Sequence, residues 1–191
     1  MVIGVLYEGG LDIDPIQELI ARVASDSGYV SPITYELYPA SAQALPKFLP
    51  AATKFSRANV DIFVVHIDTD GDGTRRRTFN DLVDKHQDLL LGIKPVAMVA
   101  DPHFETYFIK EENALKGFFK LPGTDPLPYS DMWPKARVQN LIKRNLPDEF
   151  EFLRDPVIYA QIAKELNLDL LASKDNDFSS FVRDLKAAFD V

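Results

Sequence analysis

Residues 60–67, with the sequence Val-Asp-Ile-Phe-Val-Val-His-Ile, leave few options for the fold around them. Near-continuous β-branched and aromatic residues are typical of a strand buried on both faces, as the strands of parallel sheets are. Residues 1–7 and 94–100 have the same apolar character. Since helices must cover both faces of such a sheet, the sequence predicts an α/β fold.

Segments with helical spacing alternate with these strands. We expect a further strand over 33–38, helices over 14–25, 41–57, 74–91 and 104–119, a proline-rich loop over 121–134, and C-terminal helices near 155–166 and 177–189. This alternation indicates a parallel or mostly parallel central sheet with helices on both faces. Because 191 residues suffice for one core, we expect a single domain over 1–191, with a helical extension from about residue 121.

Composition excludes several kinds of site. There is no cysteine, which excludes disulfides, thiolate metal sites and cysteine nucleophiles, so any metal must bind oxygen or histidine. The net charge of −8 argues against binding nucleic acid by charge alone, but not against a nuclease that uses cations. The first apolar run meets Glu8 after seven residues, and no run approaches the roughly 20 residues that span a bilayer. We therefore expect a cytoplasmic protein with no membrane partner.

Carboxylates collect where the predicted strands end. Glu8 follows the first strand, Asp68, Asp70 and Asp72 follow the central strand, and Asp101 and Glu105 follow the next. Ligands of open α/β sheets bind beyond the carboxyl ends of the strands. Because Mg²⁺ prefers oxygen ligands, the sequence predicts a divalent-metal site centred on Glu8, Asp68 and Asp70.

The segment 68–73, Asp-Thr-Asp-Gly-Asp-Gly, has other interpretations. An acidic glycine turn that only caps the next helix has the same composition. The segment also matches the start of a calcium loop, but Phe79 stands at the twelfth position, where a glutamate is required. The aspartate-nucleophile phosphatase signature, a strand followed by Asp-x-Asp-Gly-Thr, is similar except for the extra Asp72-Gly73 before Thr74.

Single residues have simpler explanations as well. Glu8 could be an exposed acid at a helix entry. A glutamate on a helix, such as Glu105, is usually solvated, and His66 and His103 are more often packed residues than ligands.

In combination, the strand ending in Glu8-Gly9 and the buried strand ending in Asp68-Thr69-Asp70 resemble the Toprim domain of topoisomerases, primases and the overcoming-lysogenization-defect nucleases. Residues 101–108, Asp-Pro-His-Phe-Glu-Thr-Tyr-Phe, look like the Pro-x-x-Glu-x-Trp stretch of small stand-alone Toprim proteins of bacterial defence and mobile islands, with Tyr107 at the tryptophan position. Residues 162–181 are similar to the tail of that group.

The resemblance implies a Rossmann-like, Toprim-type fold in which Glu8 serves acid/base or metal chemistry and Asp68 and Asp70 hold Mg²⁺ or Mn²⁺. Carried over in the same way, the extra ligands would be Asp12, Asp72 and Glu105. It further implies a nuclease acting on DNA or RNA, in a setting of phage defence. Since no Gly-x-x-x-x-Gly-Lys-Ser/Thr motif occurs, any ATPase partner would be a separate chain. A second copy of this chain, in a homo-oligomer, is another candidate partner.

Our leading hypothesis is therefore metal-dependent hydrolysis of a phosphodiester. Arg75, Arg76 and Arg77 follow the acidic turn and could grip the phosphate, although a solvated basic face explains them equally. One alternative is a non-catalytic Toprim subunit that binds metal or nucleic acid, with Trp133 and the aromatic residues of 104–119 as partner surface. Another is a magnesium-dependent phosphatase of small phosphomonoesters.

Overall fold

The computed structural model describes residues 1–190, and within them the sheet has four strands, all parallel. The strands are β1 (Val2–Glu8), β2 (Thr34–Ala40), β3 (Ile62–Asp68) and β4 (Lys94–Ala100), in the spatial order β2-β1-β3-β4. The predicted α/β class and parallel sheet are confirmed, and the architecture is consistent with a Rossmann-like, Toprim-type fold. The strand over 94–100 has the predicted bounds.

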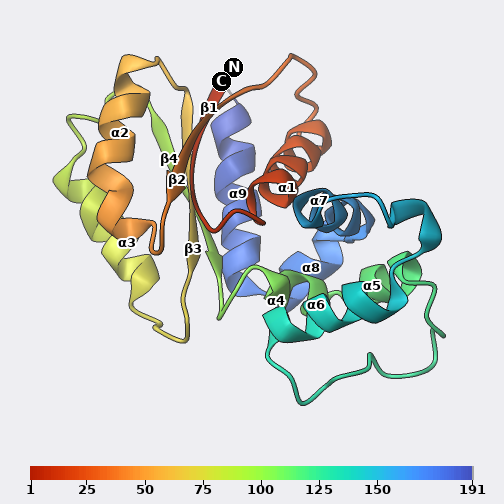
Figure 1. Ribbon diagram of the computed structural model, residues 1–191. Coiled ribbons are helices and arrows are strands. Elements are labelled where there is room, and N and C mark those ends of the chain that lie inside the picture. Colours follow the sequence, from red (N-terminus) through yellow and green to blue (C-terminus); the bar gives the residue numbers. More distant parts are fainter. Residues whose placement is uncertain (191) are drawn as a thin grey trace.

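Helices cover both faces of the sheet, as Figure 1 shows. On one face lie α1 (Ile13–Asp26) and α9 (Asn176–Phe189), and α7 (Asp155–Glu165) packs against α1. On the other face lie α2 (Phe48–Arg57) and α3 (Arg75–Lys85).

Alternation along β3 divides its side chains between two cores. Ile62 and Val64 belong to the core under α1 and α9, whereas Phe63 and Val65 belong to the core under α2 and α3. A strand that is apolar on both faces is therefore buried on both faces, as its composition predicts.

Two predicted helices are shorter than their periodicity suggested. The helix over 41–57 begins only at a 3₁₀ turn, η1 (Leu45–Lys47), and continues as α2. Pro46 stands at the start of η1, where its missing N–H is no loss. The helix over 74–91 ends at Lys85, and turns lead to Gly92, whose φ of 82° redirects the chain into β4.

The prediction of one continuous helix over 104–119 is wrong. It consists of α4 (Glu105–Lys110) and α5 (Glu112–Phe118), separated at Glu111, whose φ of −107° and ψ of 64° are not helical. The Glu111 side chain instead caps α5 by accepting the Ala114 N–H at 3.1 Å. Because Glu111 lies within a segment whose apolar residues keep helical spacing, the sequence periodicity does not reveal the break between α4 and α5.

Both predicted C-terminal helices are present as α7 and α9, but three further elements were not predicted. These are α6 (Pro134–Asn145), the 3₁₀ turn η2 (Asp148–Phe150) and α8 (Leu168–Lys174). Pro134 occupies the first turn of α6, a position that proline favours, so the end of the predicted loop is also a helix start.

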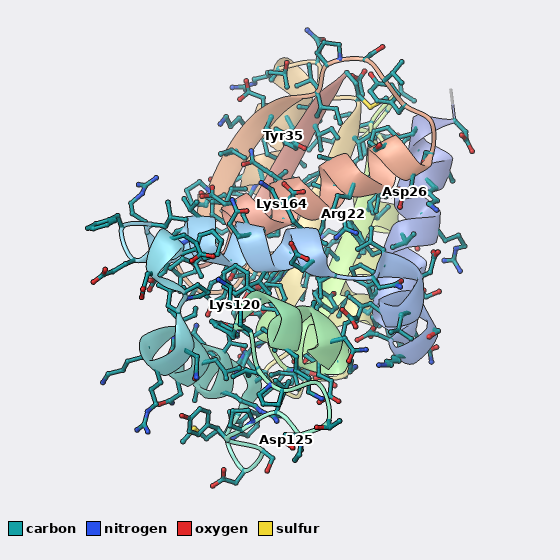
Figure 2. All side chains as sticks on the ribbon, turned by 90° about the vertical axis from the view of Figure 1, so that its right-hand side faces the viewer. Arg22, Asp26, Tyr35, Lys120, Asp125 and Lys164 are labelled. Carbon is teal, nitrogen blue, oxygen red and sulfur yellow. The ribbon has the colours of Figure 1, made fainter. Side chains whose placement is uncertain are left out.

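Arg22 ties α7 to α1, as Figure 2 shows. Its guanidinium donates to the Ala163 and Leu166 carbonyls, each at 2.6 Å, at the C-terminus of α7. A cation is favourable there, because it satisfies helix carbonyls that have no partner within the helix. Among the helices of residues 1–190, none combines the length and apolar character needed to cross a bilayer.

Candidate metal centre

The strand order creates a topological switch point between β1 and β3. From β1 the chain passes to β2 on one side, and it then returns to β3 on the other side. Glu8 is the last residue of β1 and Asp68 is the last residue of β3. Ligands of open α/β sheets bind at such a point, beyond the carboxyl ends of the strands. The fold thus brings two of the predicted site residues to the place where a ligand site is expected.

A buried histidine lies between two of the candidate carboxylates. His66 is fully buried; its Nε2 is 3.3 Å from Asp68 Oδ1 and its Nδ1 is 3.9 Å from Asp12 Oδ2. Within residues 1–190, neither ring nitrogen has a hydrogen-bond partner of good geometry, and Asp68 Oδ1 has none either. The ring of Phe104 packs edge-on against the imidazole at 5.5 Å, which keeps water away. Polar atoms buried in this way are costly unless they gain a partner.

Burial and charge shift the pKa values of His66 and Asp12. Burial lowers the pKa of His66, but hydrogen bonding to Asp68 and the negative charges of Asp68, Asp12 and Glu8 outweigh it, so the pKa is raised. Burial, with repulsion from Asp68 and Glu105, raises the pKa of Asp12 to about 6. Negative charge is therefore crowded in this part of the site.

The Glu8 side chain lies on the other face of the sheet from His66 and Asp68. Glu8 is on the same side of β1 as Leu6, which belongs to the core under α2 and α3. Its Oε1 accepts the Ala44 N–H at 2.7 Å. Burial, reinforced by Asp68, raises the pKa of Glu8 to about 7, although Ala44, His66 and Arg75 act in the opposite direction.

Asp70 stands in the loop after β3 and is half exposed. Its φ of 49° is in the left-handed region, which aspartate tolerates better than most residues. Arg75 Nη2 lies 2.7 Å from Asp70 Oδ2, and His103 Nδ1 lies 3.4 Å from Asp70 Oδ1. Arg75 also donates to the Asp68 carbonyl, so one guanidinium holds both ends of the Asp68-Thr69-Asp70 segment.

The loops after β3 and β4 are joined to each other. The Thr69 hydroxyl donates to Asp101 Oδ1, and the Thr69 N–H donates to the Ala100 carbonyl at 2.9 Å. The Asp70 N–H donates to the Pro102 carbonyl at 3.1 Å. These bonds fix the aspartates after β3 against the segment that carries His103.

Two of the predicted extra ligands have structural partners. Asp72 is exposed, and its Oδ1 accepts the Thr74 hydroxyl at 2.7 Å and the Thr74 N–H at 2.9 Å, both of which lower its pKa, so its side chain closes the turn that precedes α3. Glu105 is buried, not solvated as single helix glutamates usually are, and its Oε1 accepts the Tyr159 hydroxyl at 3.0 Å. Asp12, by contrast, lies within the group around His66.

The three arginines after the turn have different surroundings. Arg75 is buried against Asp70, as described above. Arg76 pairs with Asp177 at 2.7 Å and Asp184 at 3.8 Å on α9. Arg77 is exposed at the surface of α3.

Across residues 1–190, no three His, Asp or Glu side chains are grouped as a ready ligand set for one ion. Sequence reasoning underestimated His66 and His103, both of which contact the carboxylates. The available signal was spacing, because His66 precedes Asp68 by two residues in a strand and must share its face.

No protein-family model matches this chain, and neither the curated proteins nor the solved structures compared with it gave a match.

Proposed function

We propose that this protein is a divalent-metal-dependent nuclease that hydrolyses phosphodiester bonds at the β1–β3 switch point. The observation that carries the proposal is the group of His66, Asp68 and Asp12, in which His66 and Asp12 are buried and Asp68 is partly buried. His66 lies 3.3 Å from Asp68 Oδ1 and 3.9 Å from Asp12 Oδ2, and within residues 1–190 the buried polar atoms of His66 and Asp68 make no hydrogen bond of good geometry. Such a group, with perturbed pKa values at a ligand-binding edge, is typical of functional sites rather than of packing.

The donor set fits a divalent cation. Asp68 Oδ1 is buried, lies 3.3 Å from His66 Nε2 and makes no hydrogen bond of good geometry within residues 1–190, and burial raises the pKa values of Asp12 and Glu8. Carboxylate oxygens suit Mg²⁺ and Mn²⁺, and the nearby imidazole nitrogen suits the transition metal better. Asp68 with Asp12 would hold the ion. When bound, the ion would supply Lewis-acid stabilisation of the charge on the scissile phosphate.

Residues of the chain itself would provide the proton transfer and the phosphate contact. A carboxylate whose pKa is about 7 is suited to accept a proton from an attacking water near neutral pH, and Glu8 has this property. Arg75 is held in place by Asp70 and the Asp68 carbonyl, which orients its guanidinium at the edge of the site. An oriented guanidinium favours binding of a phosphate.

The test is cleavage of supercoiled plasmid, single-stranded DNA and structured RNA with Mg²⁺ or Mn²⁺. Wild type is compared with Glu8→Gln, with Asp68→Asn/Asp70→Asn, and with Asp88→Asn, an exposed carboxylate beyond the end of α3. We expect metal-dependent cleavage by wild type and Asp88→Asn and at least about a 100-fold loss in the other two variants, as removal of an acid/base group or metal ligand produces. Cleavage that survives in both site variants would refute the assignment.

One observation favours a second candidate, a non-catalytic subunit that binds metal or nucleic acid. Asp70 is already neutralised by Arg75, and the Ala44 N–H already binds Glu8, so both carboxylates have partners within the chain. Calorimetric metal binding without cleavage of any substrate would support this candidate against the nuclease. Capture of a phosphoaspartate at Asp68 would instead identify a phosphatase.

A further inference from the structure

The chain contains a single tryptophan, Trp133, and it is 66% exposed. Exposed apolar side chains are common, so exposure alone carries no argument. The position of Trp133 is different from that of the other exposed residues, because its ring lies 6.2 Å from the ring of His103. His103 Nδ1 is in turn 3.4 Å from Asp70 Oδ1 and 3.9 Å from Asp68 Oδ2. One imidazole thus separates an exposed indole from the candidate metal centre.

The backbone around Trp133 is held by hydrogen bonds. The Arg137 N–H donates to the Trp133 carbonyl at 2.9 Å, which begins α6. The Arg137 guanidinium donates to the Pro128 carbonyl at 2.8 Å and the Leu127 carbonyl at 2.5 Å, so it ties the proline-rich loop to the helix. A ring on a fixed backbone loses little conformational entropy when a flat ligand covers it.

A positive charge follows Trp133 closely in the chain. Lys135 is exposed two residues after Trp133, in the first turn of α6. An aromatic face combined with a cation is the arrangement that binds single-stranded nucleic acid, where bases stack and phosphates pair with the cation.

We propose that Trp133 is a stacking platform for an unpaired base of single-stranded nucleic acid. The inference rests on the proposed nuclease function, since stacking here would place a neighbouring phosphate at the edge formed by His103, Asp68 and Asp70. Bases inside a duplex are covered by their neighbours and cannot stack on a side chain without being displaced. Single strands and unpaired loops are therefore the substrate class.

The experiment compares two fluorescent dodecamers of equal charge, oligo-dT and an abasic sugar-phosphate chain. Equilibrium binding is measured by anisotropy with Mg²⁺, and gels confirm that the probes stay intact. We expect wild type to bind oligo-dT about 5- to 150-fold more tightly than the abasic chain, the range typical of one stacked base. Because Trp133 is the sole tryptophan, oligo-dT should also quench the intrinsic fluorescence and the abasic chain should not.

Variants separate stacking from folding. Trp133→Ala should bind both probes equally, and Trp133→Phe should keep most of the preference for oligo-dT. Leu91→Ala is the matched control, since Leu91 is 88% exposed but lies three residues before β4, at the opposite edge of the sheet. Equal binding of both probes by wild type, or a preference that survives in Trp133→Ala, would refute the platform.

The two proposals fail separately. Preference for oligo-dT without cleavage of any substrate would retain the platform and overturn the nuclease. Cleavage of oligo-dT and the abasic chain with equal KM would overturn the platform and retain the nuclease.

Discussion

Glu8→Gln should make the metal-free protein more stable at alkaline pH. The folded structure raises the pKa of Glu8 from 4.5 to about 7, mainly through burial. The folded state therefore binds a proton more tightly than the unfolded chain does. As pH rises from about 4.5 through 7, the unfolded chain loses its proton first, so wild type loses stability over this window.

The magnitude follows from the size of this rise. A pKa raised from 4.5 to about 7, at roughly 1.4 kcal/mol for each pH unit, amounts to about 3 kcal/mol of lost stability at pH 8. The glutamine of the variant would keep a carbonyl oxygen for the Ala44 N–H and carry no charge. At pH 8 the variant should be more stable than wild type by up to about 3 kcal/mol, or about 6 to 12 °C in Tm for a chain of this size. At pH 4 the two should be nearly equal.

The assay is urea denaturation in EDTA at pH 4, 6 and 8. Asp12 and His66 also contribute stability that is lost as pH rises, since both pKa values are raised. Glu8 is not among the groups that shift the pKa of Asp12, whereas it helps to raise the pKa of His66, so the variant also loses less of the His66 contribution as pH rises. Glu165→Gln, an exposed glutamate of α7, controls for the loss of one negative charge. A stability difference that is the same at pH 4 and pH 8, or a variant less stable than wild type at pH 8, would refute the reasoning.

Two other predictions concern stability. Arg22→Ala should lower the free energy of unfolding by about 2 to 4 kcal/mol, because two carbonyls at the end of α7 lose charged donors. Denaturant titration measures the loss, and Arg183→Ala, which removes an exposed arginine of α9, is the control. Millimolar Mg²⁺ or Mn²⁺ should raise the Tm of wild type. At 100 times the Kd, the cation would increase the free energy of unfolding by about 2.7 kcal/mol, and this stabilisation should disappear in Asp68→Asn. An unchanged Tm in wild type would contradict the metal centre.

Most of the sheet could be predicted because β1, β3 and β4 are strongly apolar and end at marked turns, whereas β2 is mixed in composition and largely only half-buried. The strand over 94–100 was predicted to the residue, and β3 differs only at its ends. The helices were harder, since their limits depend on local capping. The seven-residue α8 begins where Asn167 accepts the Leu170 N–H at 2.9 Å, and a helix of this length has little periodicity to detect.

Only those residues of the candidate site that lie at strand ends could be predicted from the sequence. The order of strands places Glu8 and Asp68 at one edge, and their positions follow from the apolar runs before them. The burial of Glu105 could not be anticipated, because its partner Tyr159 comes 54 residues later in the chain. The pairing of Arg76 with α9 depends in the same way on a contact 101 residues away.

The carboxylates of the proposed centre come from both faces of the sheet. Glu8 shares the face of Leu6, and Asp68 shares the face of Val64, so their side chains leave the sheet in opposite directions. In the proposed centre, Asp68 and Asp12 would therefore hold a cation from one face, and Glu8 would accept a proton from the other. Burial raises the pKa of both Glu8 and Asp12, and the negative charge of Asp68 adds to the rise in each, so the carboxylates of the two faces are electrostatically coupled across the strand ends.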